Sequence, residues 1–494
     1  MSVHQGLAVA CVLAVLGCAA CGWRYEQTLH DAAESPSFGR TLGDSLAEAA
    51  GDVALVTAND TCTTVLRSGT SYSHWRATEY ALPRGNRSTE LFVQSARYNG
   101  HLLVVGATSR ARDTDGTVFV YRVSAEKSTP APQVLTPPVS SAADARFFAT
   151  EIAVAATSAH FAVALPAAGQ VAVYENATPA RDAPVALASL LAAPAPSLRA
   201  FGASLSMSDN VLVVGAPFLS SPRGTRTSTS TSTTEDEEGA VYTFIRVDGR
   251  WECTPWVLRP DRTHVPHSRA RALFGYTLDI TKDGTRLVVT APCMEPPVLL
   301  RRGSTNNSDS SFSSSSSSSS SEGECIPQAL VYMRATDGAG WQLMYGVGAP
   351  PGAWETSFGA SVSINPEQGD LFVGVGAPSE EPATSAMYLY RNTRLYAHIP
   401  SPPDAYAFGR SMTMYGDILA VGVPMQSIGA PPNALNQMGG IVMFSITQLS
   451  DHAMTLVMTC SLAFFLVVVT AVLAVYKLHP SSIAALRQQQ HHHR

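Results

Sequence analysis

A repeated motif constrains the fold of this chain more than any other feature of its sequence. Each copy starts with a Phe-Gly pair or a close variant, runs through an apolar stretch that ends in VVGAP or a variant, and then reaches a strand rich in aromatic residues. Seven copies start near residues 38, 92, 147, 201, 274, 358 and 408. The spacing is regular apart from two longer intervals, which contain low-complexity inserts at 218–238 and 293–328. Such a period predicts an all-β fold, a seven-bladed β-propeller.

The order of the predicted strands indicates how the ring closes. A fourth strand precedes most of the Phe-Gly pairs, and the segment WRYEQTL at 23–29 occupies that place before the first repeat. The seventh repeat ends at Phe444 without a fourth strand of its own. The N-terminal segment is therefore predicted to complete the last blade, which removes the free edges of an open sheet.

Composition agrees with short strands and excludes one class of partner. The chain of 494 residues has 36 Gly, 32 Pro and only 15% charged residues, which favours many strands separated by turns. Its formal net charge is -6, and no dense block of Lys or Arg occurs. The electrostatic footprint of a nucleic-acid-binding protein is missing, so nucleic acid is not expected as a partner.

The two ends of the chain predict its compartment. The apolar run at 6–16 is followed by small residues, which is typical of a signal peptide over 1–22. Residues 453–476 contain no charge and, at about 1.5 Å per residue, are long enough to cross a bilayer as a helix. Basic residues follow this span, so the tail at 477–494 is expected in the cytosol. The expected topology is type I, in the plasma membrane or another secretory-pathway membrane.

The repeats at 23–444 resemble the FG-GAP propeller of integrin α chains and related single-pass surface proteins. The resemblance rests on pairs such as FGASLSMSDNVLVVGAP at 201–217 and FGASVSINPEQGDLFVGVGAP at 358–378. It implies a role in cell-surface adhesion or recognition, which is an argument by analogy. The connection at 445–452 leaves no room for the leg domains of an integrin. This departure argues against an integrin β-type partner.

The same comparison predicts that no metal ion or other cofactor is needed. Integrin propellers hold calcium in acidic loops between the first two strands of several blades. The corresponding segments here, such as TKDG at 281–284 and MYGD at 414–417, lack oxygen ligands at alternating positions. No metal site is therefore expected.

The sequence also predicts that the chain is not an enzyme and has no catalytic residues. The GDSL block at 43–46 resembles a lipase nucleophile motif, but the repeats place Ser45 between two strands of the first blade. A strand-to-helix elbow that would activate the hydroxyl is not expected there.

Cysteines and glycosylation sequons are consistent with an oxidising compartment. Four cysteines, Cys62, Cys253, Cys293 and Cys325, lie in the predicted ectodomain, and three connectivities are open. Cys293 and Cys325 flank the serine-rich insert where its two strands approach each other, so we predict that they pair. Sequons at Asn59, Asn86, Asn176 and Asn306 are candidate glycosylation sites.

Two functional interpretations follow from the sequence. The first is a surface protein in adhesion or recognition that binds a protein or glycan through propeller loops. The alternative is a non-adhesive scaffold or trafficking factor in a secretory-pathway membrane. Strand parity puts both inserts on one face, opposite the face at which the chain leaves for the membrane. The ligand-binding residues are unknown at this stage, but a partner is expected on the membrane-distal face near repeats 4 and 5.

Overall fold

The fold is known from a computed structural model, which describes a defined part of the chain. The described residues are 24–30, 41–42, 47–49, 52–58, 62–68, 75–83, 91–109, 116–123, 131–155, 157, 160–176, 183–194, 198–219, 239–260, 273–293, 327–335, 340–350, 357–367, 370–379, 384–402, 405–427 and 437–445. All of them belong to one compact unit, Trp23–Ser445. The second unit, Met1–Gly22 with Ile446–Arg494, lies outside the described residues.

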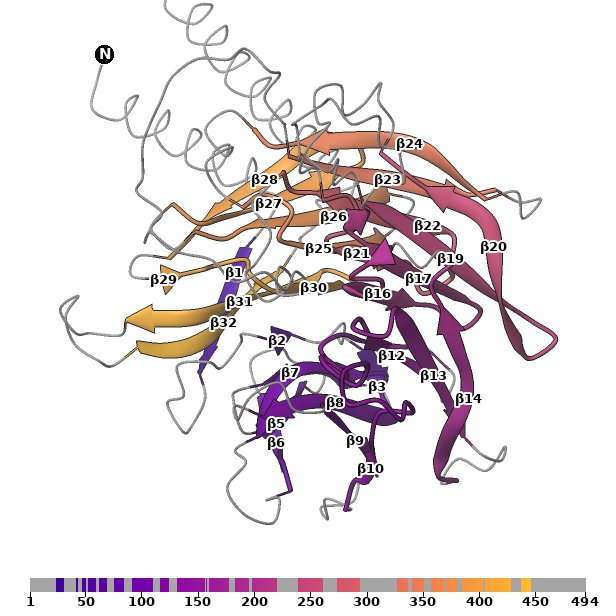
Figure 1. The fold of residues 1–494 in the computed structure, drawn as a ribbon. Coiled ribbons are helices and arrows are strands. Elements are labelled where there is room, and N and C mark those ends of the chain that lie inside the picture. Colours follow the sequence, from indigo (N-terminus) through magenta and orange to yellow (C-terminus); the bar gives the residue numbers. More distant parts are fainter. Residues whose placement is uncertain are drawn as a thin grey trace, which may run out of the picture. The chain divides into compact units, whose positions relative to one another are not determined.

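Seven antiparallel sheets of four main strands form the blades of a propeller (Figure 1). Blades 1 to 3 consist of β2 (Thr41–Leu42), β3 (Ala47–Ala49), β4 (Asp52–Ala58), β5 (Cys62–Ser68) and β6 (Trp75–Ala81); β7 (Leu91–Tyr98), β8 (Leu102–Ser109), β9 (Thr117–Arg122) and β10 (Gln133–Leu135); and β11 (Ile152–Val154), β12 (Phe161–Leu165), β13 (Gln170–Asn176) and β14 (Val185–Ala192). The prediction of an all-β, seven-bladed propeller is confirmed.

Blades 4 to 7 repeat this arrangement. Their strands are β16 (Ser204–Met207), β17 (Val211–Ala216), β19 (Ala240–Val247) and β20 (Arg250–Leu258); β21 (Leu278–Ile280), β22 (Arg286–Ala291), β23 (Gln328–Arg334) and β24 (Trp341–Gly348); β25 (Ser361–Glu367), β26 (Asp370–Ala377), β27 (Ala386–Arg391) and β28 (Arg394–Pro400); and β29 (Ala405–Tyr406), β30 (Met412–Tyr415), β31 (Ile418–Ser427), β32 (Gln437–Ser445) and β1 (Arg24–His30). A short ladder joins β15 (Leu198–Arg199) to β18 (Phe218–Leu219) beside blade 4.

The N-terminal strand completes blade 7. β1 pairs antiparallel with β32, in a register that puts Thr28 opposite Val442 and Arg24 opposite Ser445. Figure 1 shows this indigo strand among the yellow strands of the chain's last repeat. The predicted closure is confirmed, and strands from the two ends of the unit share one sheet.

The Phe of each well-formed Phe-Gly pair is a core residue between blades. Phe201, Phe274, Phe358 and Phe408 are fully buried, and each such side chain contributes about 1.5–3 kcal/mol of hydrophobic stabilisation. Phe201 packs with residues of β12 and β13 from the preceding blade and with Tyr242 of its own blade. The Gly that follows has a positive φ, for example 86° at Gly275, which few other residues adopt without strain.

The second strand of each blade is apolar on both faces because a blade lies on either side of it. All six residues of β17 are buried, and those of β22 from Leu287 to Ala291 are buried as well. In blade 7 the strand does not end at its proline. β31 continues through Pro424, and its register with β32 shifts between Val423 and Gln426. A bulge at this point accommodates a residue that cannot donate to the ladder.

The predicted membrane helix at 453–476 and the signal peptide at 1–22 lie outside the described residues. In the part of the chain that the structure describes, there is no helix of sufficient length and apolar character to cross a membrane.

Candidate functional site

The first strands of successive blades contact one another around the centre of the ring, and a hydrogen bond repeats at their joints. The residue three positions after the Phe carries a hydroxyl that donates to a backbone oxygen of the next blade. The four examples are Ser95 to Ala149 at 3.0 Å, Ser204 to Gly275 at 2.8 Å, Thr277 to Gly359 at 3.0 Å and Ser361 to Gly409 at 2.6 Å. The acceptor is in each case the residue at the Gly position of the next Phe-Gly pair.

The glycine of VVGAP makes room for this bond. A Cβ atom added to Gly215 would lie under 3.0 Å from both Ser204 Oγ and the backbone oxygen of Gly275. In blade 5 a threonine replaces this glycine, and its hydroxyl lies 2.8 Å from that of Thr277. The two halves of the repeat motif therefore meet at one inter-blade contact.

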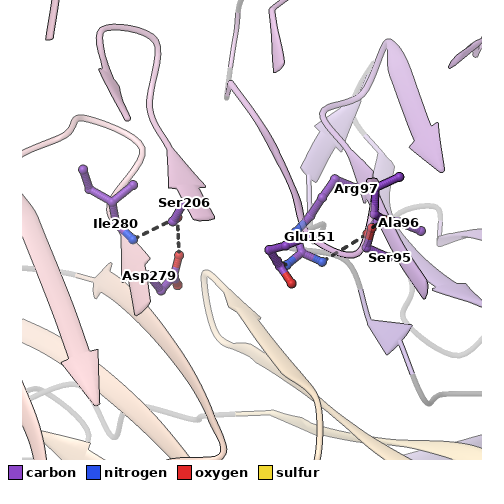
Figure 2. Close-up of polar contacts among 8 residues, drawn as sticks. Ser95, Ala96, Arg97, Glu151, Ser206, Asp279 and Ile280 are labelled. Atoms are coloured by element: carbon purple, nitrogen blue, oxygen red, sulfur yellow. Dashed lines mark hydrogen bonds and ion pairs between the residues drawn. The ribbon is translucent and has the colours of Figure 1, made fainter. Parts of the chain in front are cut away.

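Two residues further along the first strands, a second polar contact repeats (Figure 2). The Ile280 amide donates to Ser206 Oγ at 3.2 Å, and Ser206 Oγ donates to Asp279 Oδ1 at 3.1 Å. The other carboxylate oxygen of Asp279 accepts the Ile364 amide at 2.9 Å and the Ser363 hydroxyl at 3.3 Å. Asp279 thus links blades 4, 5 and 6 near the centre of the ring.

Blades 2 and 3 have the Ser95 hydroxyl joint, and an ion pair takes the place of the second contact; it is the other group drawn in Figure 2. Arg97 of β7 donates to Glu151 Oε1 at 2.9 Å, and the two side chains are 14% and 25% exposed. Arg97 and Glu151 occupy the positions of Ser206 and Ser204 in blade 4. A carboxylate cannot donate, so Glu151 cannot make the hydroxyl-to-carbonyl bond and pairs with the preceding blade.

The polar side chains at these joints hold blades together, and they are poor candidates for a binding site of their own. Their polar groups already form hydrogen bonds or ion pairs with residues of neighbouring blades. Among the described residues, no group of three or more His, Cys, Asp or Glu is placed to hold a metal ion. Asp283, in one of the turns compared above with calcium loops, accepts from Thr281 Oγ1 and from the amide and hydroxyl of Thr285.

Of the predicted modification sites, the structure describes two residues. Cys293, just after β22, is disulfide-bonded, but Cys325 lies outside the described residues, so their pairing remains a prediction. Asn176 ends β13, is partly buried, and accepts a hydrogen bond from Arg122 of blade 2 at 3.1 Å. Asn59, Asn86 and Asn306 lie outside the described residues, as does Ser45 of the GDSL block.

Exposed apolar side chains gather on the outer strands of adjacent blades. Trp256 and Val257 of β20 are 52% and 38% exposed, and Met344 of β24 is 44% exposed. The indole ring of Trp256 lies against Gly340, at the start of blade 5's last strand. Figure 1 shows β20 and β24 as neighbours on the outer side of the propeller. Val257 points to the other face of β20, because successive side chains of a strand alternate. We call Trp256 and Met344 the rim patch.

Sequence reasoning missed both the hydroxyl joints and the rim patch. The joints had a readable signal, since Ser or Thr stands three residues after the Phe in six of the seven repeats. The rim patch had none, because WECTPWVL at 251–258 contains two tryptophans and only the structure separates buried Trp251 from exposed Trp256.

Comparison with known proteins gives neighbours of the same general architecture. No protein-family model matches the chain, and no curated protein matches it. A putative 6-phosphogluconolactonase from Bacteroides uniformis is 10% identical with a TM-score of 0.43, over 73% of this chain and 84% of that one. A periplasmic gluconolactonase from Pseudomonas aeruginosa is 12% identical with a TM-score of 0.40, over 73% and 86%. KlAtg21, in a complex with the coiled-coil of AgAtg16, is 11% identical with a TM-score of 0.42, over 77% and 90%.

The prediction that this chain is not an enzyme is contradicted by these neighbours, two of which are named as lactonases. That prediction was wrong in its reasoning, because it searched for local motifs. A propeller can assemble an active site from residues on several blades, which no contiguous motif displays. At these identities and TM-scores, no reaction, substrate or partner of the neighbours is carried over to this chain.

Proposed function

We propose that this chain is a single-pass type I membrane protein whose propeller binds a protein or glycan partner in adhesion or recognition. Three features support the proposal: the seven repeats that resemble FG-GAP repeats, the apolar segments near both ends of the chain, and the rim patch. The rim patch carries the most weight because it is independent of the resemblance.

The rim patch has the character of a contact surface for a macromolecule. Large apolar side chains are common singly on a surface, but Trp256 and Met344 are both exposed on the outer strands of adjacent blades. Tryptophan is enriched among the residues that dominate binding energy at interfaces. Trp256 is also held in place by its contact with Gly340 of the next blade, so little side-chain freedom would be lost on binding.

The two inserts belong to the same two blades as the rim patch. Both connect the second strand of a blade to the third, after β17 and after β22. β15, in the segment that leads into the first strand of blade 4, pairs with β18, at the start of the insert that follows β17. The two connections therefore lie side by side. Loops that join the second strand of a blade to the third therefore share one face with loops that join one blade to the next. We propose that this face points away from the membrane. We also propose that it contributes to partner binding at blades 4 and 5.

Adhesion of cells that express the tagged full chain tests this function. The probe is a monolayer of untransfected cells, with protease or glycosidase treatment of the monolayer to separate protein from glycan partners. We expect Trp256→Ser to lower adhesion at least fivefold at equal surface level. Leu395→Ser is the matched control, because Leu395 of β28 is 46% exposed on another outer strand. Equal adhesion of the wild type, both variants and untransfected cells would contradict the proposal.

Surface biotinylation of the same intact cells separates this function from the alternative. Labelling of the full chain is expected for a surface recognition protein. Retention of all the protein inside the cell would favour a secretory-pathway scaffold or trafficking factor instead.

A further inference from the structure

Blades 3 and 4 meet without the hydroxyl joint that links blades 2 and 3 and each successive pair from blade 4 to blade 7. In blade 3, Glu151 stands at the position that Ser204 has in blade 4. A carboxylate has no proton to donate to the backbone oxygen of Gly202. Polar contacts elsewhere along this interface are therefore more important for holding the two blades together.

Two polar side chains of blade 3 face this interface. Phe161 of β12 pairs with Tyr174 of β13. One position further along, this register places His160 opposite Glu175. Phe161 packs in the apolar cluster between blades 2 and 3. Because side chains alternate along a strand, His160 and Glu175 face blade 4 instead.

Two residues of blade 4 meet this pair. Arg246 of β19 is the cross-strand partner of Trp251 of β20. Trp251 packs edge-on against His160, with ring centroids 5.9 Å apart. Arg246 Nη2 lies 3.0 Å from both carboxylate oxygens of Glu175 and donates to Oε2. An imidazole contact and an ion pair thus stand next to each other across the interface.

Three charged groups from the two blades act on His160. Burial lowers the pKa of His160, and the Arg246 charge lowers it further. The hydrogen bond of Nε2 to the backbone oxygen of Asp209, 2.8 Å long, and the carboxylates of Glu175 and Asp209 act in the opposite direction. A buried proton on His160 therefore requires a carboxylate that compensates for its charge.

We propose that protonation of His160 makes Glu175 exchange partners, from Arg246 of blade 4 to His160 of its own blade. Nε2 already donates to the Asp209 oxygen, so the added proton at Nδ1 supplies a second donor. Glu175 Oε1 is buried and has no hydrogen bond among the described residues, which leaves it as the acceptor. The exchange converts an ion pair between two blades into one inside blade 3. Arg246 is then left beside a new positive charge, which loosens the interface in acid.

Asp209 limits how far the interface opens. Its carboxylate accepts hydrogen bonds from the amide of Thr157 at 3.0 Å and from the Thr157 hydroxyl. This contact also links the two blades and does not involve His160. The exchange therefore loosens one interface and leaves the ring closed. The proposal is independent of the rim patch and of the proposed partner-binding function.

Double-mutant cycles on the full chain test the exchange. Glu175→Gln and Arg246→Gln, alone and together, give the coupling of the two residues as a factor in the unfolding constant, at about pH 7.5 and pH 5.0. We expect this factor to fall at least threefold in acid, and the factor from Glu175→Gln with His160→Gln to rise. His160→Gln is also the matched background, because glutamine donates to the Asp209 oxygen but does not titrate. In that background the coupling of Glu175 with Arg246 should be equal at both pH values.

Hydrogen exchange of the full chain shows where the change occurs. After correction for the intrinsic rate, amides in 160–176 and 240–251 should exchange at least threefold faster at the lower pH, and His160→Gln should abolish the difference. The control is blade 5, where β23 and β24 contain no group that titrates in this range. A coupling of Glu175 with Arg246 that is equal at both pH values in the wild type, a fall that persists in His160→Gln, or equal acceleration in all blades would overturn the proposal.

Discussion

Ser361 of blade 6 donates its hydroxyl to the backbone oxygen of Gly409 in blade 7 across 2.6 Å, and both Ser361 and the adjoining Phe408 are buried. Gly376, from the second strand of blade 6, lies against the same bond without a side chain to obstruct it. The Phe-Gly pair of one blade and the VVGAP glycine of the preceding blade are thus two parts of a single joint.

Loss of one such hydroxyl should weaken the whole ring. Ser361→Ala leaves the Gly409 oxygen without this donor, which costs about 1–3 kcal/mol for a buried group. We expect the midpoint of urea unfolding to fall. Thr78→Ala, on the exposed outer strand β6, removes a hydroxyl outside the joints and serves as a control that should change the midpoint little.

A methyl group on the glycine of the joint should be worse than loss of the hydroxyl. Gly215→Ala brings Cβ under 3.0 Å from Ser204 Oγ and from the Gly275 oxygen, so the joint between blades 4 and 5 must widen. Overpacking of this kind costs about 1–3 kcal/mol, to which the lost hydrogen bond adds. Addition of Ser204→Ala should recover only part of the loss, because the carbonyl clash remains. Full recovery would show that the backbone of the joint is more adaptable than described.

The ion pair between Arg97 of blade 2 and Glu151 of blade 3 should be replaceable by the hydroxyls that stand at the same positions in blade 4. Arg97→Ser or Glu151→Ser alone leaves a partly buried charge without its partner and is expected to cost about 1–3 kcal/mol. The double variant removes both charges and lets residue 151 donate to the backbone oxygen of Gly202, as Ser204 does to that of Gly275. We expect its unfolding free energy to be closer to the wild-type value than that of either single variant. Additive losses in this double-mutant cycle would argue against coupling.

Buried His160 should make stability depend on pH. Its Nε2 lies 2.8 Å from the backbone oxygen of Asp209, and its ring packs edge-on against Trp251. Burial lowers the pKa of His160, as does the charge of Arg246, while the Asp209 hydrogen bond and the Glu175 charge oppose this shift.

Because residue 160 binds a proton more readily in the unfolded chain than in the folded chain, the free energy of unfolding rises with pH between the lowered pKa of folded His160 and its unfolded pKa. The contribution of His160 is complete above the unfolded pKa of about 6.5 and is lost progressively as the pH falls below it. His160→Gln can still donate to the Asp209 oxygen but does not titrate. We expect the wild type to lose more unfolding free energy than this variant between about pH 7.5 and 5.5, and parallel curves would exclude His160 as the cause.

The fold was predictable because its signals are periodic and local. The seven Phe-Gly pairs are regularly placed, and the chain supplies the missing strand at its start, so both blade number and closure followed. Partners across blades were harder to predict, since Ser361 and Gly409 are far apart in sequence and meet only in the ring. Glu151 departs from the Ser or Thr of the other repeats, and its ion pair with Arg97 one blade away has no signal in the sequence. Pro424 cannot donate to the ladder, but the bulge in β31 carries the strand past it.

The candidate surfaces were less predictable than the fold. Trp256 is exposed and lies against Gly340 of blade 5, whereas Trp251 is buried. No pattern in the sequence of β20 distinguishes Trp256 from Trp251.

Closure of the ring by β1 joins the two ends of the propeller in one sheet, and a designed disulfide tests it most directly. The register places Thr28 opposite Val442, and directly opposed residues in antiparallel strands have Cβ atoms about 4.5–5.5 Å apart, close to the reach of a disulfide. We predict that Thr28→Cys with Val442→Cys forms this bond in the full chain, as peptide mapping without reduction would show. Thr28→Cys with Val421→Cys is the control, because Val421 lies on β31, one strand further away. A disulfide in the control pair, or none in the Thr28 and Val442 pair despite a folded protein, would contradict the closure.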